Sequence, residues 1–75
     1  MPSLPVVSSD EVIQAFVRAA WFIARRKGSH TTLTRAGSFV VLTVPQHREM
    51  PRGTLRALIR DAGLSVEEFI ELLKK

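Results

Sequence analysis

Two S-x-x-E sequences, one near each end of the chain, indicate where two helices begin. In this arrangement, a capping box, the serine hydroxyl accepts the backbone N–H of the glutamate, and the glutamate carboxylate accepts the serine N–H. The first box is Ser8 and Glu11, and the second is Ser65 and Glu68. After the first box, apolar residues follow at the spacing of one helix face: Val12, Ile13, Phe16, Val17 and Ala20. We therefore predict helices that start after Ser8 and after Ser65.

Three segments between these helices have the composition of β-strands. They are residues 21–27 (WFIARRK), 29–35 (SHTTLTR) and 39–44 (FVVLTV). Gly28 separates the first two, and the sequence AGS offers a turn before the third. Pro45 should end the third strand, because proline cannot donate a hydrogen bond to a sheet ladder.

Strict alternation of side chains predicts the faces of these strands. In the first strand, one face is predicted to hold Trp21, Ile23, Arg25 and Lys27. The other face is predicted to hold Phe22, Ala24 and Arg26. In the third strand, the core side is predicted to be Val40, Leu42 and Val44. If Leu33 of the second strand points to the core, His30 faces outward together with Thr32 and Thr34.

A further helix is predicted between the last strand and the second capping box. Thr54 is its expected N-cap, and Gly63 is expected to stop it. Its apolar stripe is Leu55, Leu58, Ile59 and Ala62. Leu64 and Phe69 are placed to form the hydrophobic staple of the last helix.

This order of elements predicts an α+β fold: a helix, three antiparallel strands and a helix, with an extra short helix at the C-terminus. Helices that cover one face of the sheet make a two-layer sandwich and leave the other face in contact with water. Double-stranded RNA-binding domains share this architecture. We interpret residues 8–75 as a single domain that follows an extended leader, residues 1–7.

Size and composition exclude several kinds of site. A chain of 75 residues has room for one modest core, so we expect no cofactor cavity. The chain has no cysteine and two histidines, which excludes disulfides and leaves too few ligands for a closed zinc site. No apolar stretch approaches the ~20 residues of a membrane-spanning helix, and the N-terminus lacks the pattern of a secretory signal. We expect a cytoplasmic protein that does not contact a membrane.

Charge is sorted along the chain. Residues 18–60 hold nine cations and one anion, whereas the rest of the chain holds two cations and six anions. The middle therefore carries +8 and the ends −4, which together give the net +4. Such a field attracts a polyanion, most simply nucleic acid. The alternative is a basic surface that serves solubility alone, although solubility does not require sorted charges.

A spacing of four residues aligns Arg52, Arg56 and Arg60 along one side of the predicted helix, where they suit a row of phosphates. Further cations come from the loop before this helix and from the first strand. The residues predicted to bind RNA are Arg25, Arg26, Arg48, Arg52, Arg56 and Arg60. For the helical stripe taken alone, a solvated surface is the alternative interpretation.

His30 is the candidate for proton transfer. An exposed imidazole can take or give a proton near neutral pH. RNA supplies its own nucleophile, the 2′-hydroxyl, so a protein need only move protons and stabilise the phosphorane. Lys27 and the amides of Gly28 and Ser29 lie beside His30 in the sequence and can provide that stabilisation. An uninvolved surface histidine is the alternative that the residues alone leave open.

Three segments in order resemble the HicA family, also called YcfA-like, of small bacterial toxins that cleave mRNA. They read RRKGSHTTLT, LTVPQH and PRGTLRALIRDAGLSVEEF. The shared elements are G-S-H after a strand, V-P-x-H at the end of the third strand, and G-T-L-R at the start of the helical part. The resemblance extends from about Asp10 to Leu73. Where family members commonly have glycine before the aromatic residue of the first strand, this chain has Ala20.

The resemblance implies a double-stranded RNA-binding-like fold and a metal-independent endoribonuclease of a type II toxin–antitoxin system. It also implies that His30 is catalytic, within a supporting loop of Lys27, Gly28 and Ser29. His47 matches the histidine of the V-P-x-H element. It is either the acid that complements His30 as base or a loop residue that contacts the RNA backbone.

The implied partners are an RNA substrate and a HicB-like antitoxin that covers the face of His30. Such antitoxins usually also bind DNA, so DNA is contacted only indirectly. Exposed apolar residues on the sheet would give the antitoxin a surface to cover: Phe22, Val41 and Phe39. The alternative function is a non-catalytic double-stranded RNA-binding module, which needs the fold and the basic helix but not the imidazole.

Overall fold

The computed structural model describes residues 3–75 and contains the predicted order of elements. In chain order these are α1 (Ser9–Arg18), β1 (Phe22–Lys27), β2 (His30–Thr34), β3 (Leu42–Pro45), α2 (Arg52–Asp61) and α3 (Val66–Leu73). The strands form one antiparallel sheet in the order β1-β2-β3. The predicted α+β topology, including the additional C-terminal helix, is confirmed.

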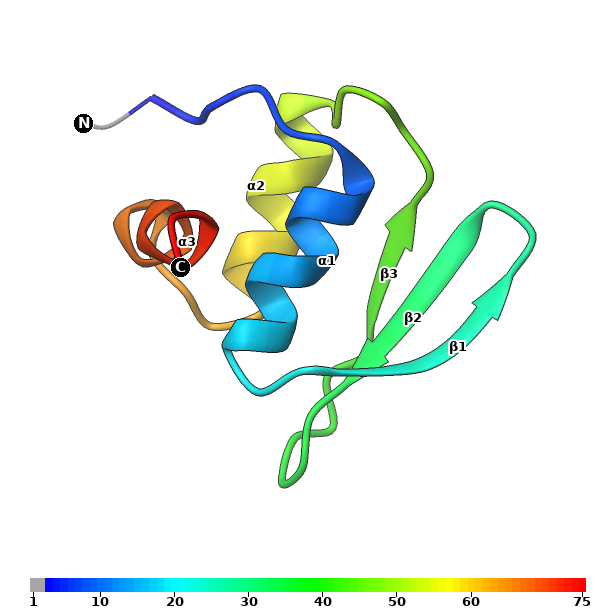
Figure 1. Cartoon of the computed structure of the whole chain (residues 1–75). Helices are drawn as coiled ribbons and strands as arrows, with labels where there is room; N and C mark the ends of the chain where they lie inside the picture. Colours follow the sequence, from blue (N-terminus) through cyan, green and yellow to red (C-terminus); the bar gives the residue numbers. More distant parts are fainter. Residues whose placement is uncertain (1–2) are drawn as a thin grey trace.

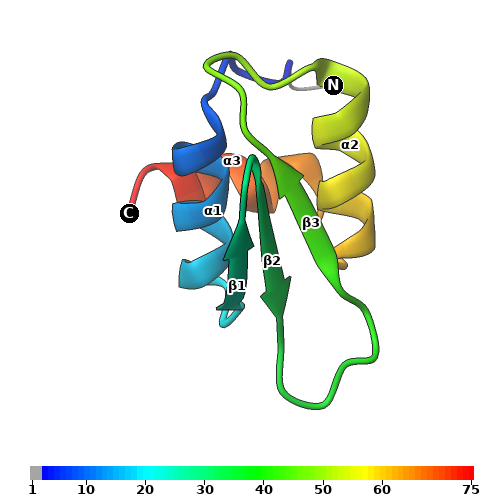
Figure 2. The ribbon, with the colours of Figure 1, turned by 90° about the vertical axis from the view of Figure 1, so that its right-hand side faces the viewer.

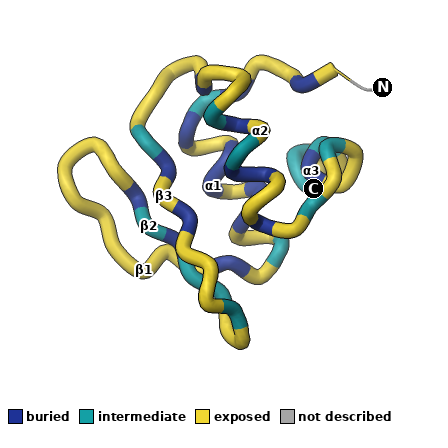
Figure 3. Tube along the Cα trace, turned by 180° about the vertical axis from the view of Figure 1, so that it is seen from behind, coloured by how far each residue is buried: buried dark blue, intermediate teal, exposed yellow. Residues whose placement is uncertain are grey.

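The helices lie on one side of the sheet (Figures 1 and 2). Helix α1 contacts β1 and β3, α2 contacts β3, and α3 contacts both other helices. The opposite face of the sheet has no helix over it, and β1 is exposed along its whole length (Figure 3). Within residues 3–75, no helix is long and apolar enough to cross a membrane.

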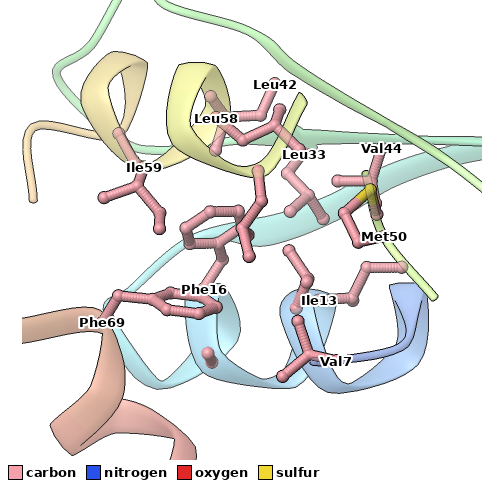
Figure 4. Packing of buried hydrophobic residues seen from close by; sticks show 14 of the residues in the cluster. Val7, Ile13, Phe16, Leu33, Leu42, Val44, Met50, Leu58, Ile59 and Phe69 are labelled. Carbon is pink, nitrogen blue, oxygen red and sulfur yellow. The ribbon is translucent and has the colours of Figure 1, made fainter. Parts of the chain in front are cut away.

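The hydrophobic core fills the space between the sheet and the helices (Figure 4). Phe16 of α1 and Phe69 of α3 are fully buried, with ring centroids 5.8 Å apart. Leu33 and Leu42 point into the same core from β2 and β3. Helix α3 is anchored at its C-terminal end as well, because Arg18 donates to the carbonyl oxygen of Leu72 at 2.7 Å.

Residues 3–7 of the predicted leader have no regular secondary structure, yet they contribute to the core. Leu4 and Val7 are buried among the apolar side chains. The carbonyl oxygen of Val7 accepts the N–H of Met50 at 2.7 Å, which ties the segment to the loop before α2. The division of the chain into a leader and a domain at residue 8 stays a prediction.

Both predicted capping boxes are present. In α1, Glu11 accepts the N–H of Ser8 at 2.9 Å and donates its own N–H to the Ser8 hydroxyl at 3.2 Å. Ser65 and Glu68 make the same pair of bonds in α3. The bonds from the backbone N–H and the hydroxyl of Ser65 lower the pKa of the Glu68 carboxyl below its ordinary value, because they stabilise the charged form.

The predicted cap of α2 at Thr54 is wrong. The helix begins at Arg52, with Pro51 as its N-cap and no side-chain hydrogen bond to that end. The carbonyl oxygen of Pro51 accepts the N–H of Leu55 at 2.9 Å, which is the first bond of the helix. The fixed φ of proline, here −57°, already suits the entry into a helix, so the helix starts without a hydroxyl cap.

Helices α1 and α2 end in the same way but with different residues. In both, the N–H groups of the first two residues after the C-cap donate to carbonyl oxygens of the last helical turn, the arrangement called a Schellman motif. The residue just after the cap must adopt a positive φ. In α2 it is Gly63, at φ +76°, as predicted. In α1 it is Ala20, at φ +73°, and it is the one described non-glycine residue with positive φ.

We therefore expect Ala20→Gly to stabilise the protein. A left-handed conformation costs an alanine about 1–2 kcal/mol. Glycine avoids this cost but loses about 0.5–1 kcal/mol more through its freer unfolded chain. The net gain in the free energy of unfolding should be about 0.5–1 kcal/mol, measured by thermal or urea unfolding. Ala19→Gly is the control: Ala19 has φ −94°, so the same change there should destabilise, and equal effects at the two positions would contradict the argument.

The pairing of β1 with β2 corrects the predicted faces of the first strand. Its register shifts between Ile23 and Arg25, so Ala24 is an extra residue, a β-bulge. Because residues paired across the ladder share a face, Phe22 lies with Arg25 and Lys27 on the outer face. The inner face of the same strand holds Ile23 and Arg26. Strict alternation failed here because one added residue reverses the order of faces beyond it.

The third strand is shorter than predicted. β3 begins at Leu42, which pairs with Leu33, so residues 39–41 belong to the connecting loop. Leu42 and Val44 are buried, as predicted, but Val40 is 41% exposed and its predicted core position is wrong. The strand before this loop ends at Thr34, and the next residue, Arg35, stacks its guanidinium 4.8 Å from the centre of the Trp21 ring.

Candidate functional site

A two-residue turn holds His30 at the end of the β1–β2 hairpin. Lys27 and His30 are the last paired residues, and Gly28, at φ +58°, is the first residue of the turn between them. Such a tight hairpin turn with one positive φ is typical of glycine at this position. The turn is also tied to β3, because Gln46 donates its N–H to the carbonyl oxygen of Ser29 at 2.7 Å.

The imidazole of His30 lies on the outer face of the sheet. Its neighbours Thr31 and Leu33 are buried on the helix side, and His30 itself is exposed, so the predicted outward orientation is confirmed. Its ring nitrogen Nδ1 lies 3.4 Å from the Ser29 hydroxyl oxygen, and which of the two donates depends on the tautomer. The group is therefore open to a ligand and has one local polar neighbour.

The outer face of the sheet carries two of the predicted cations beside this imidazole. Lys27 pairs with His30, and Arg25 pairs with Thr32 at the next outward position. The three strands contain no aspartate or glutamate. An anion that approaches this face therefore encounters cations and hydroxyl groups and no carboxylate of the sheet.

Arg26 does not belong to this face, although the sequence placed it among the RNA-binding residues. Arg26 pairs with the buried Thr31 and therefore lies on the helix side, where it lines a hollow of about 510 Å³ between α1 and β1. Ile23 and the exposed side of α1 line the same hollow. Arg26 thus faces a different surface from Arg25 and Lys27.

His47 lies near His30 because β3 runs beside β2. Pro45 pairs with His30, and His47 follows Pro45 by two positions, so at most about 7 Å of chain joins the Cα atoms of Pro45 and His47. Ser9 holds the backbone of this segment: its hydroxyl donates to the carbonyl oxygen of Pro45 at 2.6 Å and accepts the N–H of His47 at 2.6 Å. The side chain of His47 remains exposed.

Ser9 was not among the site residues predicted from the sequence. It is 1% exposed and fixes the segment that carries His47, so it acts as a positioning residue. One signal for it was present in the sequence. Ser9 occupies the same helix face as Val12, Ile13 and Phe16, where a polar residue needs a buried partner.

The arginine stripe of α2 points away from the outer face of the sheet. Leu58 lies toward Leu42 of β3, whereas Ile59 lies toward Phe69 of α3 (Figure 4). Because each residue turns a helix by about 100°, the stripe continues around α2 beyond Ile59, on the side away from Leu58. The stripe consists of Arg52, Arg56 and Arg60, all exposed.

The predicted basic residues therefore do not form a single surface. Both views place the β1–β2 turn at the same end of the molecule as the 46–51 loop, which leads into α2 (Figures 1 and 2). Arg48 and Arg52 lie in or next to that loop, at the His30 end. Arg60 lies at the other end of α2 and makes an exposed ion pair with Asp61 at 3.3 Å, a kind of pair that contributes little stability.

No group of three or more potential metal-ligating side chains occurs within the described residues 3–75. The site is thus the open sheet face of a small α+β sandwich, on which one imidazole and two cations lie together. This fold and site define a class of small basic domains suited to an anionic ligand.

A protein-family model matches most of the chain. Residues 9–64 match the model described as HicA toxin of bacterial toxin-antitoxin. The chain belongs to the HicA toxin family, and it is the toxin component of a toxin–antitoxin system whose partner is an antitoxin. No curated protein matches the sequence significantly. The matched range includes His30 and His47 but ends before α3.

Proposed function

We propose that this toxin is an endoribonuclease that cleaves mRNA in the cytoplasm without a metal ion, with His30 as its proton-transfer group. His30 takes the proton of a ribose 2′-hydroxyl while that oxygen attacks the adjacent phosphorus. A new O2′–P bond forms, the P–O5′ bond breaks, and the leaving 5′-oxygen takes up a proton. The products then carry a 2′,3′-cyclic phosphate and a 5′-hydroxyl.

The observation that carries this proposal is the position of His30. Its imidazole is exposed beside Lys27 on a sheet face whose strands have no acidic side chain. A phosphodiester can approach such a face, and the ammonium of Lys27 can stabilise the charge that develops on the phosphorane. The N–H groups of Gly28 and Ser29, in the turn next to His30, are proposed to assist. The family match supports the toxin role but does not extend to this chemistry.

The antitoxin is proposed to resemble HicB and to cover the same outer face, which would exclude RNA from His30. The positive charge of this face suits an acidic partner, and its exposed apolar surface suits an apolar one. Phe22 is 63% exposed and shares the face with Arg25 and Lys27. DNA would be bound by the antitoxin and not by this chain.

Cleavage of a single-stranded RNA by the purified chain tests the proposal. We expect shortened RNA with cyclic phosphate ends in the presence of EDTA, and no cleavage of the same strand when the ribose 2′-hydroxyls are replaced by hydrogen. Cleavage in EDTA would show that the reaction needs no divalent metal ion. The loss of cleavage in the deoxyribose strand would show that the 2′-hydroxyl is the nucleophile. RNA that is bound but stays intact would overturn the enzymatic proposal.

One observation favours the alternative, a non-catalytic double-stranded RNA-binding module. The arginines of α2 form a stripe that does not share the outer sheet face with His30, and their spacing suits phosphates. On this alternative, duplex RNA binds with a steep salt dependence, and replacing His30 changes nothing. The cleavage assay separates the two functions.

A further inference from the structure

The bulge at Ala24 places an aromatic side chain on the cationic outer face of the sheet. Without the extra residue, Phe22 and Arg25 would lie on opposite faces; with it, Phe22 shares the face of Arg25, Lys27 and His30. Phe22 is 63% exposed, although a large apolar residue in so small a domain would be more stable if it were buried. Its exposure on this particular face suggests a ligand.

Pairing across the sheet orders this face into three outward rows. Lys27, His30 and Pro45 form the first row, at the hairpin end. Arg25, Thr32 and Thr43 form the second row. Phe22 and Thr34 form the third row.

These rows set the distance between the imidazole and the aromatic ring. His30 and Thr34 are four residues apart in β2, which corresponds to about 13 Å along a strand. A base that stacks on Phe22 therefore belongs to a different nucleotide from the one whose phosphate lies at His30. Arg25 lies between them, where an intervening phosphate would pass.

We propose that the outer face binds single-stranded RNA, with one unpaired base stacked on Phe22 at a fixed distance from the bond cleaved at His30. This proposal rests on the proposed ribonuclease function and adds its substrate class and a residue that positions the substrate. Open sheet faces that combine exposed aromatic rings with cations bind single strands by stacking, because every base has a π-face. A duplex keeps its bases paired and stacked on each other, so it cannot supply one.

Charge favours RNA over an apolar protein segment as the occupant of this face. The ring is flanked by Arg25 and by threonine hydroxyls, and the strands contain no carboxylate. A phosphate backbone is complementary to that pattern, and the hydroxyls can bond to ribose or base edges. The loop of residues 35–41 projects from the sheet at the end where Phe22 begins β1 (Figures 1 and 2).

The test measures binding with a mixed-sequence single-stranded oligonucleotide that carries 2′-O-methyl groups, which the chain can bind but not cleave. We expect Phe22→Ala to weaken this binding by about 5- to 150-fold, the loss that one stacked base produces. Phe22→Trp should restore the affinity, because the indole ring also stacks. Ile23→Ala is the matched control, since Ile23 is the next residue of β1 and faces the helices. The same strand annealed into a duplex should bind without sensitivity to Phe22.

Cleavage by the wild-type chain and by Phe22→Ala distinguishes the two levels of the proposal. If the wild type cleaves RNA, we expect Phe22→Ala to raise KM and to leave the rate at saturating RNA unchanged, since Phe22 does not touch the cleaved bond. Equal binding and equal KM in Phe22→Ala would overturn the stacking proposal and leave the ribonuclease intact. If Phe22→Ala weakened binding of the antitoxin but not of RNA, the stacking proposal would also be overturned. No cleavage by the wild type would overturn the proposed function itself, and the proposed cleavage register with it.

Discussion

Replacement of His30 with alanine is expected to slow RNA cleavage about 10²- to 10⁴-fold, the usual contribution of one general acid–base group. The imidazole would no longer take the 2′-hydroxyl proton, and the exposed cations would still bind the RNA backbone. Because His30 is exposed, the free energy of unfolding should change by no more than about 0.5 kcal/mol. Single-turnover cleavage at saturating protein measures the chemical step directly.

Two further variants make this test specific. Thr32→Ala removes a side chain from the same strand and the same face. Its hydroxyl is proposed to contact RNA and not to move a proton, so this variant should keep nearly the full cleavage rate at saturating protein. His47→Ala separates the two roles that the sequence leaves open. Loss of the rate at saturation identifies His47 as the acid, whereas loss of affinity alone identifies a contact to the backbone. Undiminished cleavage by His30→Ala would show that the catalyst lies elsewhere.

The largest effect on stability is expected from Phe69→Ala, which should lower the free energy of unfolding by about 3–5 kcal/mol. Phe69 is fully buried and packs against Phe16, so truncation leaves a cavity between α1 and α3. Domains have a free energy of unfolding of about 0.05–0.15 kcal/mol per residue, so this chain of 75 residues should have about 4–11 kcal/mol in total. Urea unfolding followed by circular dichroism should show a large loss or an unfolded chain.

Phe39→Ala is the matched control for this change. It is the same substitution in the same chain, but Phe39 is fully exposed in the loop of residues 35–41. Its effect should stay within about 0.5 kcal/mol. A small effect of Phe69→Ala would mean that α3 contributes little to the stability of the core.

The helix boundaries show which parts of the fold local sequence predicts well. Capping boxes and a C-terminal glycine act within one turn, so Ser8, Ser65 and Gly63 could be interpreted without any tertiary information. The start of α2 was missed by three residues, because the backbone geometry of Pro51 already suits the entry into a helix. Thr54 offered a hydroxyl that the helix does not use.

The sheet was predicted less accurately because strand pairing is not local. Val40 continued a regular apolar alternation, yet the ladder stops at the pair of Leu33 and Leu42 and leaves it in a loop. The same limit affected the candidate site. His30 was placed correctly from its buried neighbours, whereas Arg26 and the stripe of α2 were assigned to an RNA surface that they do not share with it.

The sequence by itself determined the order of elements, the starts of α1 and α3, the end of α2 and the outward position of His30. These features depend on contacts within a few residues, so periodicity and capping are sufficient to predict them. In α1 it predicted the buried Val12, Ile13 and Phe16 correctly, but Val17 of the same predicted stripe is 46% exposed and Ala20 lies beyond the helix end.

Only the tertiary structure decided which side chains share the face of His30, because one unpaired residue at Ala24 places Phe22, and not Ile23, on the outer face with Arg25 and Lys27. It also decided the roles of Ser9 and α3, since a buried hydroxyl and a covering helix acquire their partners only when distant segments pack together.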